Sequence, residues 1–366
     1  MQGYDVIVLG AGAAGMFAAI EAGRRGRRVL VVDHAKAAGE KIRISGGGRC
    51  NFTNTGIAPE RFLSKNPRFA LSALRRYTAA DFIARVDAAG IAWHEKTLGQ
   101  LFCDGPATQI IAMLLREMAQ AGVGLWLGCT LGEVRRVAGG FEVETARGTV
   151  RAASVIVATG GKSIPKMGAT GYGYKVAETF GIPVTETRPA LVPLTFAEQE
   201  LDWMRPLAGV ALAGRVSRGK VGFDEAVLFT HRGLSGPAVL QISSYWREGE
   251  AITLDLVPGR DVAGFLIAEK KVAGRAALRT ALGKILPEKL ARVVEAQSGA
   301  GGPLAEMGRA ALEAVAAVAP WAWTMSPSAE EAGRWSRLRA SCEKCGDAPC
   351  EHRLFTGLAG LTGRPR

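Results

Sequence analysis

The sequence predicts an α/β fold, and three stretches of its first half carry this prediction. An apolar strand at Val6–Leu9 runs into a Gly-x-Gly-x-x-Gly turn, which opens an Ala-rich helix. Short alternating runs between Gly turns predict a β-meander over about residues 124–152. A second buried strand, Val155–Ala158, ends in Thr159 and Gly160. This combination predicts a Rossmann-like dinucleotide-binding domain at the start of the chain.

The glycine turn has the spacing that a bound pyrophosphate requires. Gly10 makes the tight turn, Gly12 lets the backbone approach the phosphates, and Gly15 lets the helix pack close to its strand. The phosphates then lie at a helix N-terminus, where free N–H groups and the helix dipole favour negative charge. Ala14 belongs to the same expected site. Asp33, 23 residues after Gly10, ends the second strand and can accept hydrogen bonds from a ribose. The alternative is a Gly-rich turn in an unrelated α/β sheet.

Length and composition limit the classes of protein that fit this chain. Its 366 residues suffice for two domains, and 48% hydrophobic with 22% charged residues excludes a disordered chain. No signal peptide and no apolar run of membrane-spanning length are found, so we expect a cytoplasmic protein without a membrane partner. A net charge of +12 favours a polyanionic partner such as RNA. Arginines such as Arg24 and Arg25 are equally typical of a solvated surface.

The chain is expected to divide into a cofactor-binding domain at 1–190, a second domain at 191–325 and an atypical tail at 326–366. The first domain holds a helical insert over about 60–120. In the second domain, short strands with Gly turns predict a β-barrel-like part over about 191–258. Ala- and Leu-rich runs then predict a helical part over about 261–321.

Local signals place elements within the insert. Thr78-Ala-Ala-Asp81 has the form of a capping box and begins a helix that continues through Val86. Gln109–Ala119 is a second amphipathic helix, and Leu101–Asp104 is a short strand with its turn.

The meander follows the insert. We expect a strand-like run at Gly124–Val137, an alternating strand at Phe141–Thr145 and a further short strand at Thr149–Arg151. The stretch Gly168–Tyr174 is expected to open a helix.

A second Gly-rich stretch, residues 39–54, contains three consecutive glycines among polar residues. We expect no regular element there, but a loop that lets a ligand approach the backbone closely. A flexible surface linker is the alternative. Residues of this region that are expected to bind the cofactor are Lys41, Ser45, Gly46, Gly47 and Asn51.

The order of the predicted elements favours FAD over NAD as the bound dinucleotide. A Rossmann-like start, an antiparallel meander and a second strand ending in Thr159 and Gly160 form the arrangement of the glutathione-reductase type of FAD-binding domain. A single-cofactor NAD dehydrogenase needs neither the meander nor the second strand end. Because no second Gly-x-Gly-x-x-Gly is present, the reductant has no dedicated domain and must use a looser site or the substrate face of the flavin.

Five parts of the chain together carry the motifs of one known family. They are Gly10–Gly15, Gly39–Lys41 with Ser45–Asn54, Ala158–Gly161, Pro189–Leu194 and Thr230–Pro237. With these motifs the chain resembles a bacterial family of NAD(P)/FAD-dependent oxidoreductases, which includes a 23S ribosomal-RNA dihydrouridine synthase and a reductase of the bile-acid pathway. The resemblance covers residues 4 to about 325. It implies FAD as cofactor, NAD(P)H as electron donor, and reduction of uridine to dihydrouridine in ribosomal RNA or its precursor.

Uridine reduction places a hydride on C6 and a proton on C5 of uracil, so it requires an acid. Cys50 is the first candidate, and the adjacent Arg49 can lower its pKa or hold an oxygen atom. His231 is the second candidate, and Asn51 can bind an edge of uracil or flavin. The alternatives are that Cys50 is a small packed residue beside the cofactor and that His231 is a core histidine.

Two departures from the family pattern bear on activity. The family has Gly-Asp-Gly-Tyr where this chain has Tyr172 after Gly171, so an acidic role is in doubt there. The family also ends with a strand and a Gly-rich helix start that close the flavin site, whereas 326–366 contains neither Val nor Ile. We hypothesise a change of reading frame near Glu330.

The tail also allows a rival hypothesis. It contains Cys342, Cys345, Cys350 and His352, and these could form a zinc site. Their spacing fits no standard module, so no metal is expected.

Three functions therefore stay open at this point. They are an RNA-directed flavin reductase, a small-molecule ene-reductase that acts on conjugated carbonyls, and a flavin-binding but inactive remnant.

Overall fold

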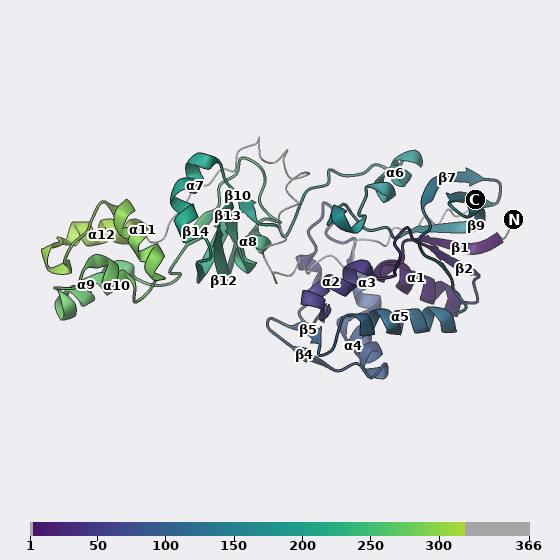
Figure 1. The fold of residues 1–366 in the computed structure, drawn as a ribbon, viewed down its shortest axis with the longest axis horizontal. Helices are drawn as coiled ribbons and strands as arrows, with labels where there is room; N and C mark the ends of the chain where they lie inside the picture. The colour runs from purple at the N-terminus through teal and green to yellow at the C-terminus, as the bar shows by residue number, and fades with distance from the viewer. Residues whose placement is uncertain (1–2, 319–366) are drawn as a thin grey trace. The chain divides into compact units, whose positions relative to one another are not determined.

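The computed structural model describes residues 3–318 and divides them into two units, with the boundary between Thr187 and Arg188 (Figure 1). Each unit has its own hydrophobic core. The two units are described separately below. The predicted tail at 326–366, with its hypothesised frame change and its cysteine-rich zinc candidate, lies outside the described residues.

The first unit is built on a six-stranded sheet. In spatial order its strands are β6 (Gly124–Trp126), β2 (Val29–Val32), β1 (Gly3–Leu9), β9 (Gly148–Val157), β8 (Gly140–Thr145) and β7 (Leu131–Val137). The first four strands are parallel, and β9, β8 and β7 form an antiparallel meander. This arrangement confirms the Rossmann-like fold with its meander.

The alternation of side chains along β1 buries both faces of the sheet. Val8 faces a core shared with α1 (Ala13–Arg24) and α5 (Thr108–Gln120), whereas Ile7 and Leu9 face the core that α6 (Tyr172–Thr179) covers. Figure 1 shows α1 and α5 on one side of the sheet and α6 on the other. The carboxyl ends of β1 and β2 therefore lie between helical layers, where such folds bind ligands.

Three of the predicted strands have different bounds. The run Gly124–Val137 is not one strand, because Gly128 has a left-handed backbone (φ +59°) and separates β6 from β7. The two pieces pair with different partners, β2 and β8. Conversely, the predicted strands at Thr149–Arg151 and Val155–Ala158 form one ten-residue strand, β9.

The region between β2 and α5 contains more regular structure than predicted. The predicted loop over residues 39–54 contains two regular elements, the short helix α2 (Glu40–Ile44) and strand β3 (Asn51–Asn54). The glycines between them, in Ser45–Gly48, form a turn in which Gly46 (φ +59°) and Gly47 (φ +64°) have a left-handed backbone, so no regular element is formed there. β3 pairs with β5 (Gln100–Cys103), which in turn pairs with β4 (Trp93–Glu95).

Two further helices complete the insert, α3 (Leu71–Arg76) and α4 (Ala79–Ala88). The predicted capping box is confirmed at the start of α4. Asp81 N donates to Thr78 Oγ1 at 3.3 Å, and Thr78 N donates to the Asp81 carboxylate at 2.7 Å. These two bonds satisfy donors that the first turn of a helix leaves free.

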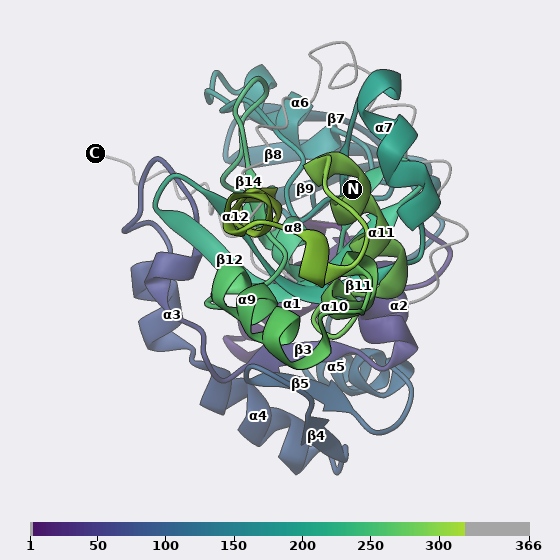
Figure 2. The ribbon, with the colours of Figure 1, turned by 90° about the vertical axis from the view of Figure 1, so that its left-hand side faces the viewer.

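The second unit combines a sheet with helices around one core (Figure 2). Its antiparallel strands, in spatial order, are β10 (Leu194–Thr195), β13 (Gly233–Ser235), β12 (Val221–Thr230), β11 (Ala211–Arg218) and β14 (Thr253–Asp255). Helices α7 (Glu198–Met204) and α8 (Pro237–Ile242) accompany the strands. The later helices are α9 (Val262–Ala273), α10 (Leu278–Leu282), α11 (Glu288–Ser298) and α12 (Arg309–Val318).

In this unit the strands and the short helices α7 and α8 come first, and α9, α10, α11 and α12 follow them. No helix within residues 3–318 is both long and apolar enough to cross a membrane.

Candidate functional site

The glycine turn at the end of β1 leaves space for a ligand at one position and none at the others. A Cβ on Gly10 would lie 2.5 Å from the Ala158 carbonyl oxygen, and one on Gly15 would lie 1.9 Å from the Gly10 oxygen. A Cβ on Gly12 would meet no protein atom within 4 Å. Gly10 and Gly15 are therefore required by packing, whereas the open space beside Gly12 is available to a pyrophosphate.

The turn is fixed by hydrogen bonds on both sides of Ala11. The Ala11 N–H donates to Asp33 Oδ2 at 2.6 Å, and the Ala11 carbonyl accepts from Gly39 N at 2.9 Å. Asp33 Oδ1 accepts from Ala35 N at 2.8 Å. Each carboxylate oxygen retains a lone pair, because a carboxylate can accept about four hydrogen bonds. Asp33 thus holds the turn in place and can still accept bonds from ribose hydroxyls.

The end of β9 contributes polar groups beside the same turn. Thr159 Oγ1 is buried and has no hydrogen-bond partner among the described residues. A buried hydroxyl without a partner is unfavourable by about 1–3 kcal/mol, so a ligand group that bonds to it is expected. Lys41, from α2, donates to Ser163 Oγ at 3.1 Å, and its Nζ lies 3.7 Å from the position of a Cβ on Gly160. The structure thus brings Lys41 to the end of β9.

Three features of the first unit fit a bound FAD. The unfilled space at Gly12, the remaining lone pairs of Asp33 and the unpartnered Thr159 hydroxyl match a pyrophosphate, a ribose and a further polar group of a dinucleotide. The residues of the first unit fit the cofactor that the sequence predicts.

The Ser45–Asn51 turn is tightly constrained. Cys50 N donates to the Ser45 carbonyl at 2.9 Å, and Arg49 N donates to the Gly46 carbonyl at 3.2 Å. A Cβ on Gly46 would lie 2.8 Å from Asn51 N, so Gly46 packs against the start of β3. Gly47 is exposed beside it, with a left-handed backbone (φ +64°).

Cys50 has two unusual properties. Its side chain is only 2% exposed and belongs to the core beneath α1, and its backbone is left-handed, with φ +51°. A non-glycine residue in this conformation is strained, and such strain is concentrated at functional sites. Asn51 beside it is 6% exposed.

Arg49 points away from this core. Its side chain is exposed, and its Nη1 donates to the Asp104 carbonyl at 2.7 Å. Cys103 N donates to the Arg49 carbonyl at 3.0 Å, so the last residue of β5 and the residue after it orient both ends of Arg49. Cys103 itself is fully buried, and this burial, together with the charge of Asp104, raises its pKa to about 11.

His231 lies in the second unit, on the exposed turn between β12 and β13. The turn is held by Thr230, whose Oγ1 donates to the Gly233 carbonyl at 3.0 Å and accepts from Arg232 N at 3.3 Å. The turn geometry therefore presents His231 to solvent and does not bury it as a core histidine.

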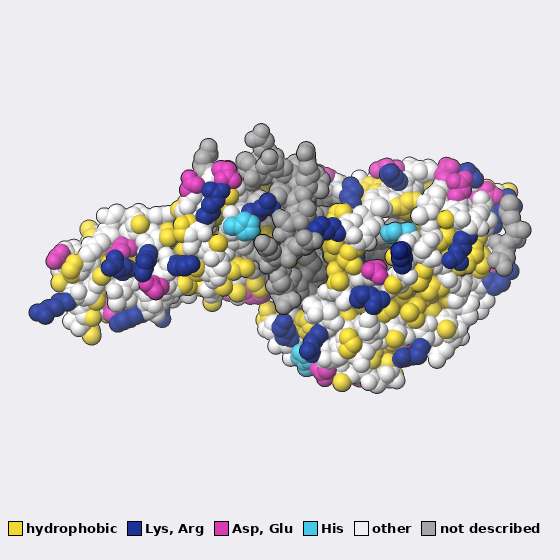
Figure 3. Space-filling model, in the orientation of Figure 1, with side chains coloured by type: hydrophobic (Ala, Val, Ile, Leu, Met, Phe, Trp, Pro, Cys, Tyr) yellow, Lys and Arg dark blue, Asp and Glu magenta, His cyan; other side chains and the backbone are white. Residues whose placement is uncertain are grey.

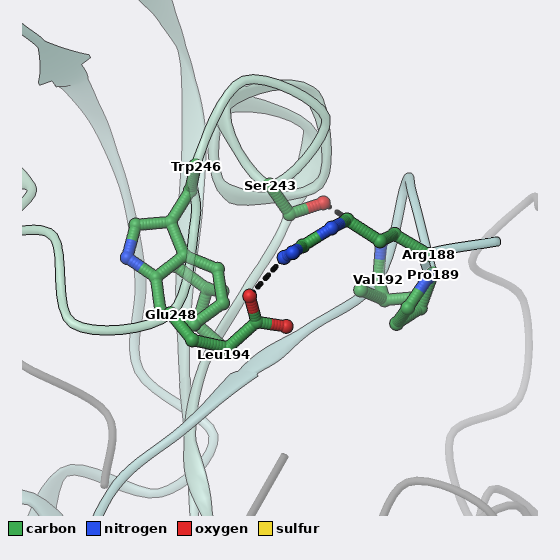
Figure 4. A pocket seen from close by; sticks show the side chains of 7 residues that line it. All are labelled: Arg188, Pro189, Val192, Leu194, Ser243, Trp246 and Glu248. Atoms are coloured by element: carbon green, nitrogen blue, oxygen red, sulfur yellow. Dashed lines mark hydrogen bonds and ion pairs between the residues drawn. The ribbon is translucent and has the colours of Figure 1, made fainter. Parts of the chain in front are cut away.

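The second unit also contains a small pocket that the sequence did not indicate (Figure 4). The Arg188 guanidinium points toward the Glu248 carboxylate and forms an ion pair with it, beside the ring of Trp246. Val192 N donates to Ser243 Oγ at 3.0 Å across the same pocket. Of the residues that line this pocket, only those in Pro189–Leu194 belong to a motif segment of the sequence.

Three contacts of the dinucleotide site were also missed from the sequence, namely those of Ala11, Gly39 and Ser163. Each is a backbone group or a hydroxyl that becomes important only through a distant partner. Ala11 and Gly39 lie in the motif segments Gly10–Gly15 and Gly39–Lys41, whereas Ser163 lies in none.

The turn, the acidic strand end and the meander define a Rossmann-type flavoprotein. The family model described as HI0933-like protein Rossmann domain matches residues 4–320, and the chain belongs to this family. The match leaves the last residues of the chain outside it.

Curated relatives are similar over most of the chain. A ribosomal RNA dihydrouridine synthase of Escherichia coli is 48% identical over 292 residues, which are 79% of this chain and 73% of that protein. The protein of the same name from Haemophilus influenzae is 43% identical, with 79% and 73% covered. A 3-dehydro-bile acid delta(4,6)-reductase of Clostridium scindens is 27% identical, with 66% of this chain and 60% of that protein covered. These similarities make the chain a flavoprotein oxidoreductase.

Proposed function

We propose that this protein is an FAD-dependent reductase that converts uridine to dihydrouridine in ribosomal RNA or its precursor, in the cytoplasm, with NAD(P)H as electron donor. The observation that carries the proposal is the 48% identity to a ribosomal RNA dihydrouridine synthase over 79% of the chain. The net charge of +12 also favours a polyanionic substrate.

The residues proposed to hold FAD come from three places in the first unit. The turn residues Gly10, Gly12, Ala14 and Gly15 contact the pyrophosphate, with Gly12 leaving the open space for it. Asp33 accepts hydrogen bonds from the adenosine ribose through its remaining lone pairs.

The other proposed FAD ligands lie at the end of β9 and in the Gly-rich turn. Thr159 Oγ1 is buried without a partner among residues 3–318, so it is proposed to bond a polar atom of the cofactor. Gly160 and Lys41 lie beside it. The remaining proposed ligands are Ser45, Gly46, Gly47 and Asn51.

Bound FAD would supply the hydride chemistry for C6 of uracil, with NAD(P)H as the source of electrons. Because the C5=C6 π bond is lost when C6 gains a hydride, a side chain must supply one proton to C5. We assign this proton to the Cys50 thiol, because its strained left-handed backbone marks a position held for function.

Two further residues have proposed roles in the reaction. Arg49 is fixed through its bond to Asp104 and carries a permanent positive charge, which suits a uracil carbonyl or a phosphate oxygen. His231, exposed on its turn, is the second candidate for the acid.

A second candidate function has one observation in its favour. The relative from Clostridium scindens is a bile-acid reductase, and reduction of a C=C bond conjugated to a carbonyl uses the same hydride and proton. Its identity of 27% over 66% of the chain is lower than that of the RNA-modifying relatives.

The test in cells is to map dihydrouridine in ribosomal RNA with and without the gene. Loss of one dihydrouridine on deletion, and its return with the wild-type gene but not with a Gly12→Ala gene, supports the proposal. An unchanged dihydrouridine content on deletion rejects it.

A further inference from the structure

The excess positive charge of the chain is not gathered in one place on the face that Figure 3 shows, where Lys and Arg side chains are dispersed over both units. The cations that can contribute most to binding a polyanion are those without a carboxylate partner. A cation that is already neutralised by a neighbouring carboxylate contributes little to binding a polyanion.

Three of the four arginines at and just after the end of α1 have carboxylate partners. Arg24 pairs with Glu117 at 2.8 Å, Arg25 with Glu21 at 3.9 Å, and Arg28 with Asp5 at 3.8 Å. Arg27 is exposed and has no ion pair among the described residues, so most but not all of this cluster's charge is directed toward the protein's own carboxylates.

The segment Glu60–Arg76, here called the basic segment, differs from that cluster. It contains five cations and one acidic residue, Glu60. Its cations are Arg61, Lys65, Arg68, Arg75 and Arg76. All five are exposed, and none forms an ion pair within the described part of the chain.

The basic segment also exposes apolar side chains. Phe69 is 66% exposed and Leu63 is 51% exposed. The backbone around Phe69 is fixed, because Phe69 N donates to the Asn66 carbonyl at 3.0 Å and Arg68 N donates to Asn66 Oδ1 at 3.2 Å. An exposed aromatic ring on an ordered turn among free cations is the arrangement that binds single-stranded nucleic acid, because bases stack on the ring and phosphates pair with the cations.

Both ends of the basic segment are attached to the body of the first unit. After it, the Tyr77 ring packs edge-on against Phe17 of α1, with 4.9 Å between the ring centroids. Before it, Thr55 N donates to the Gly99 carbonyl at 2.8 Å. The segment follows strand β3, which begins at the proposed FAD ligand Asn51.

We propose that the basic segment is an RNA-docking surface that binds a single-stranded region of ribosomal RNA. Its cations contact the phosphates, and Phe69 stacks on a base. The inference rests on the proposed function for the identity of the RNA, but the free cations and the exposed ring are observations of their own.

The experiment uses the FAD-bound protein and a fluorescently labelled, single-stranded RNA of mixed sequence, with binding followed by anisotropy over a range of salt concentrations. The test variant is Arg75→Gln/Arg76→Gln. Its matched control is Arg25→Gln/Arg28→Gln, which removes the same charge from arginines that have carboxylate partners. We expect the test variant to lose about 1.4 from the slope of log affinity against log salt, at about 0.7 per phosphate contact. The control keeps the wild-type slope.

Phe69→Ala tests the stacking contact without a change of charge. We expect it to weaken RNA binding about five-fold or more at every salt concentration, with the slope retained, and Phe69→Trp to restore binding. Flavin absorbance and the melting temperature of each variant establish that it is folded.

The outcomes separate this inference from the proposed function. If wild-type protein binds the RNA and the test variants bind it equally well, the docking surface is rejected while uridine reduction is untouched. If binding depends on the basic segment but no dihydrouridine forms in ribosomal RNA, the proposed function fails and the surface stands. Binding to phosphatidylserine vesicles in place of RNA would overturn the assignment to RNA.

Discussion

The backbone N–H of Ala11 donates to the carboxylate of Asp33 at 2.6 Å, so the acidic end of β2 holds the glycine turn that ends β1. The carboxylate therefore has two roles in this account. It fixes the glycine turn, and its remaining lone pairs are proposed to accept hydrogen bonds from the ribose.

Asp33→Asn is expected to weaken FAD binding about ten-fold or more, because a hydrogen bond to a charged group contributes about 1.5–3 kcal/mol. The measurement is the dissociation constant of FAD from quenching of its fluorescence. The control is Asp5→Asn, since the Asp5 carboxylate also accepts a bond from a backbone N–H, that of Arg28, at 2.8 Å. Equal effects of the two substitutions would contradict the role of Asp33 in the ribose site.

Alanine substitutions at two glycines of the turn are expected to have opposite effects on folding and FAD binding. Gly12→Ala leaves the apoprotein folded, because its Cβ meets no protein atom within 4 Å, but it removes FAD binding by filling the space of the pyrophosphate. Gly15→Ala lowers the melting temperature of the apoprotein, because its Cβ would lie 1.9 Å from the Gly10 oxygen. Thermal unfolding with and without FAD distinguishes the two. An unstable Gly12→Ala apoprotein, or one that binds FAD normally, would show that the space is not the pyrophosphate site.

Cys50→Ala is expected to retain flavin absorbance and lose uridine reduction, since it removes the proposed proton donor. Cys129→Ala, another fully buried cysteine, is the control for loss of a packed sulfur. Both substitutions are expected to lower the free energy of unfolding by about 1 kcal/mol. If Cys50→Ala turns over like Cys129→Ala, Cys50 is a packing residue and His231→Gln becomes the variant to measure.

The burial of Cys103 predicts a pH dependence of stability. Its pKa is raised from 9.0 to about 11, so between these values the folded protein keeps a proton that the unfolded chain releases. This contribution is fully present below pH 9 and is lost as the pH rises toward 11. Cys103→Ala should therefore show a shallower alkaline loss of stability than wild type in urea unfolding at pH 8, 9 and 10. An identical slope would mean that the thiol is accessible to solvent.

Local patterns predicted the elements whose causes are local. The glycine turn after β1 and the capping box of α4 depend on residues within a few positions of each other, and both are confirmed. Gly124–Val137 was predicted as one strand-like run, but a strand-like composition does not specify where a run breaks or which strands it pairs with. Only the left-handed backbone at Gly128 shows that the run divides between β2 and β8.

The site was predicted as a set of residue types but not as a set of contacts. Asp33 and Lys41 were expected at the cofactor from their motifs. Their actual partners, Ala11 and Ser163, follow from the parallel order of β2, β1 and β9, which brings together residues as far apart as Lys41 and Ser163. The free cations of the basic segment were likewise hidden, because net charge does not reveal which arginines have partners.

We propose that this protein reduces uridine in ribosomal RNA with electrons from FAD. The most direct measurement incubates the FAD-bound protein and NAD(P)H with ribosomal RNA from cells that lack the gene, and quantifies dihydrouridine by mass spectrometry of the nucleosides. We expect dihydrouridine to appear with wild-type protein and not with the Gly12→Ala variant. Unmodified RNA together with rapid reduction of a conjugated steroid ketone would contradict it and assign the protein to small-molecule reduction.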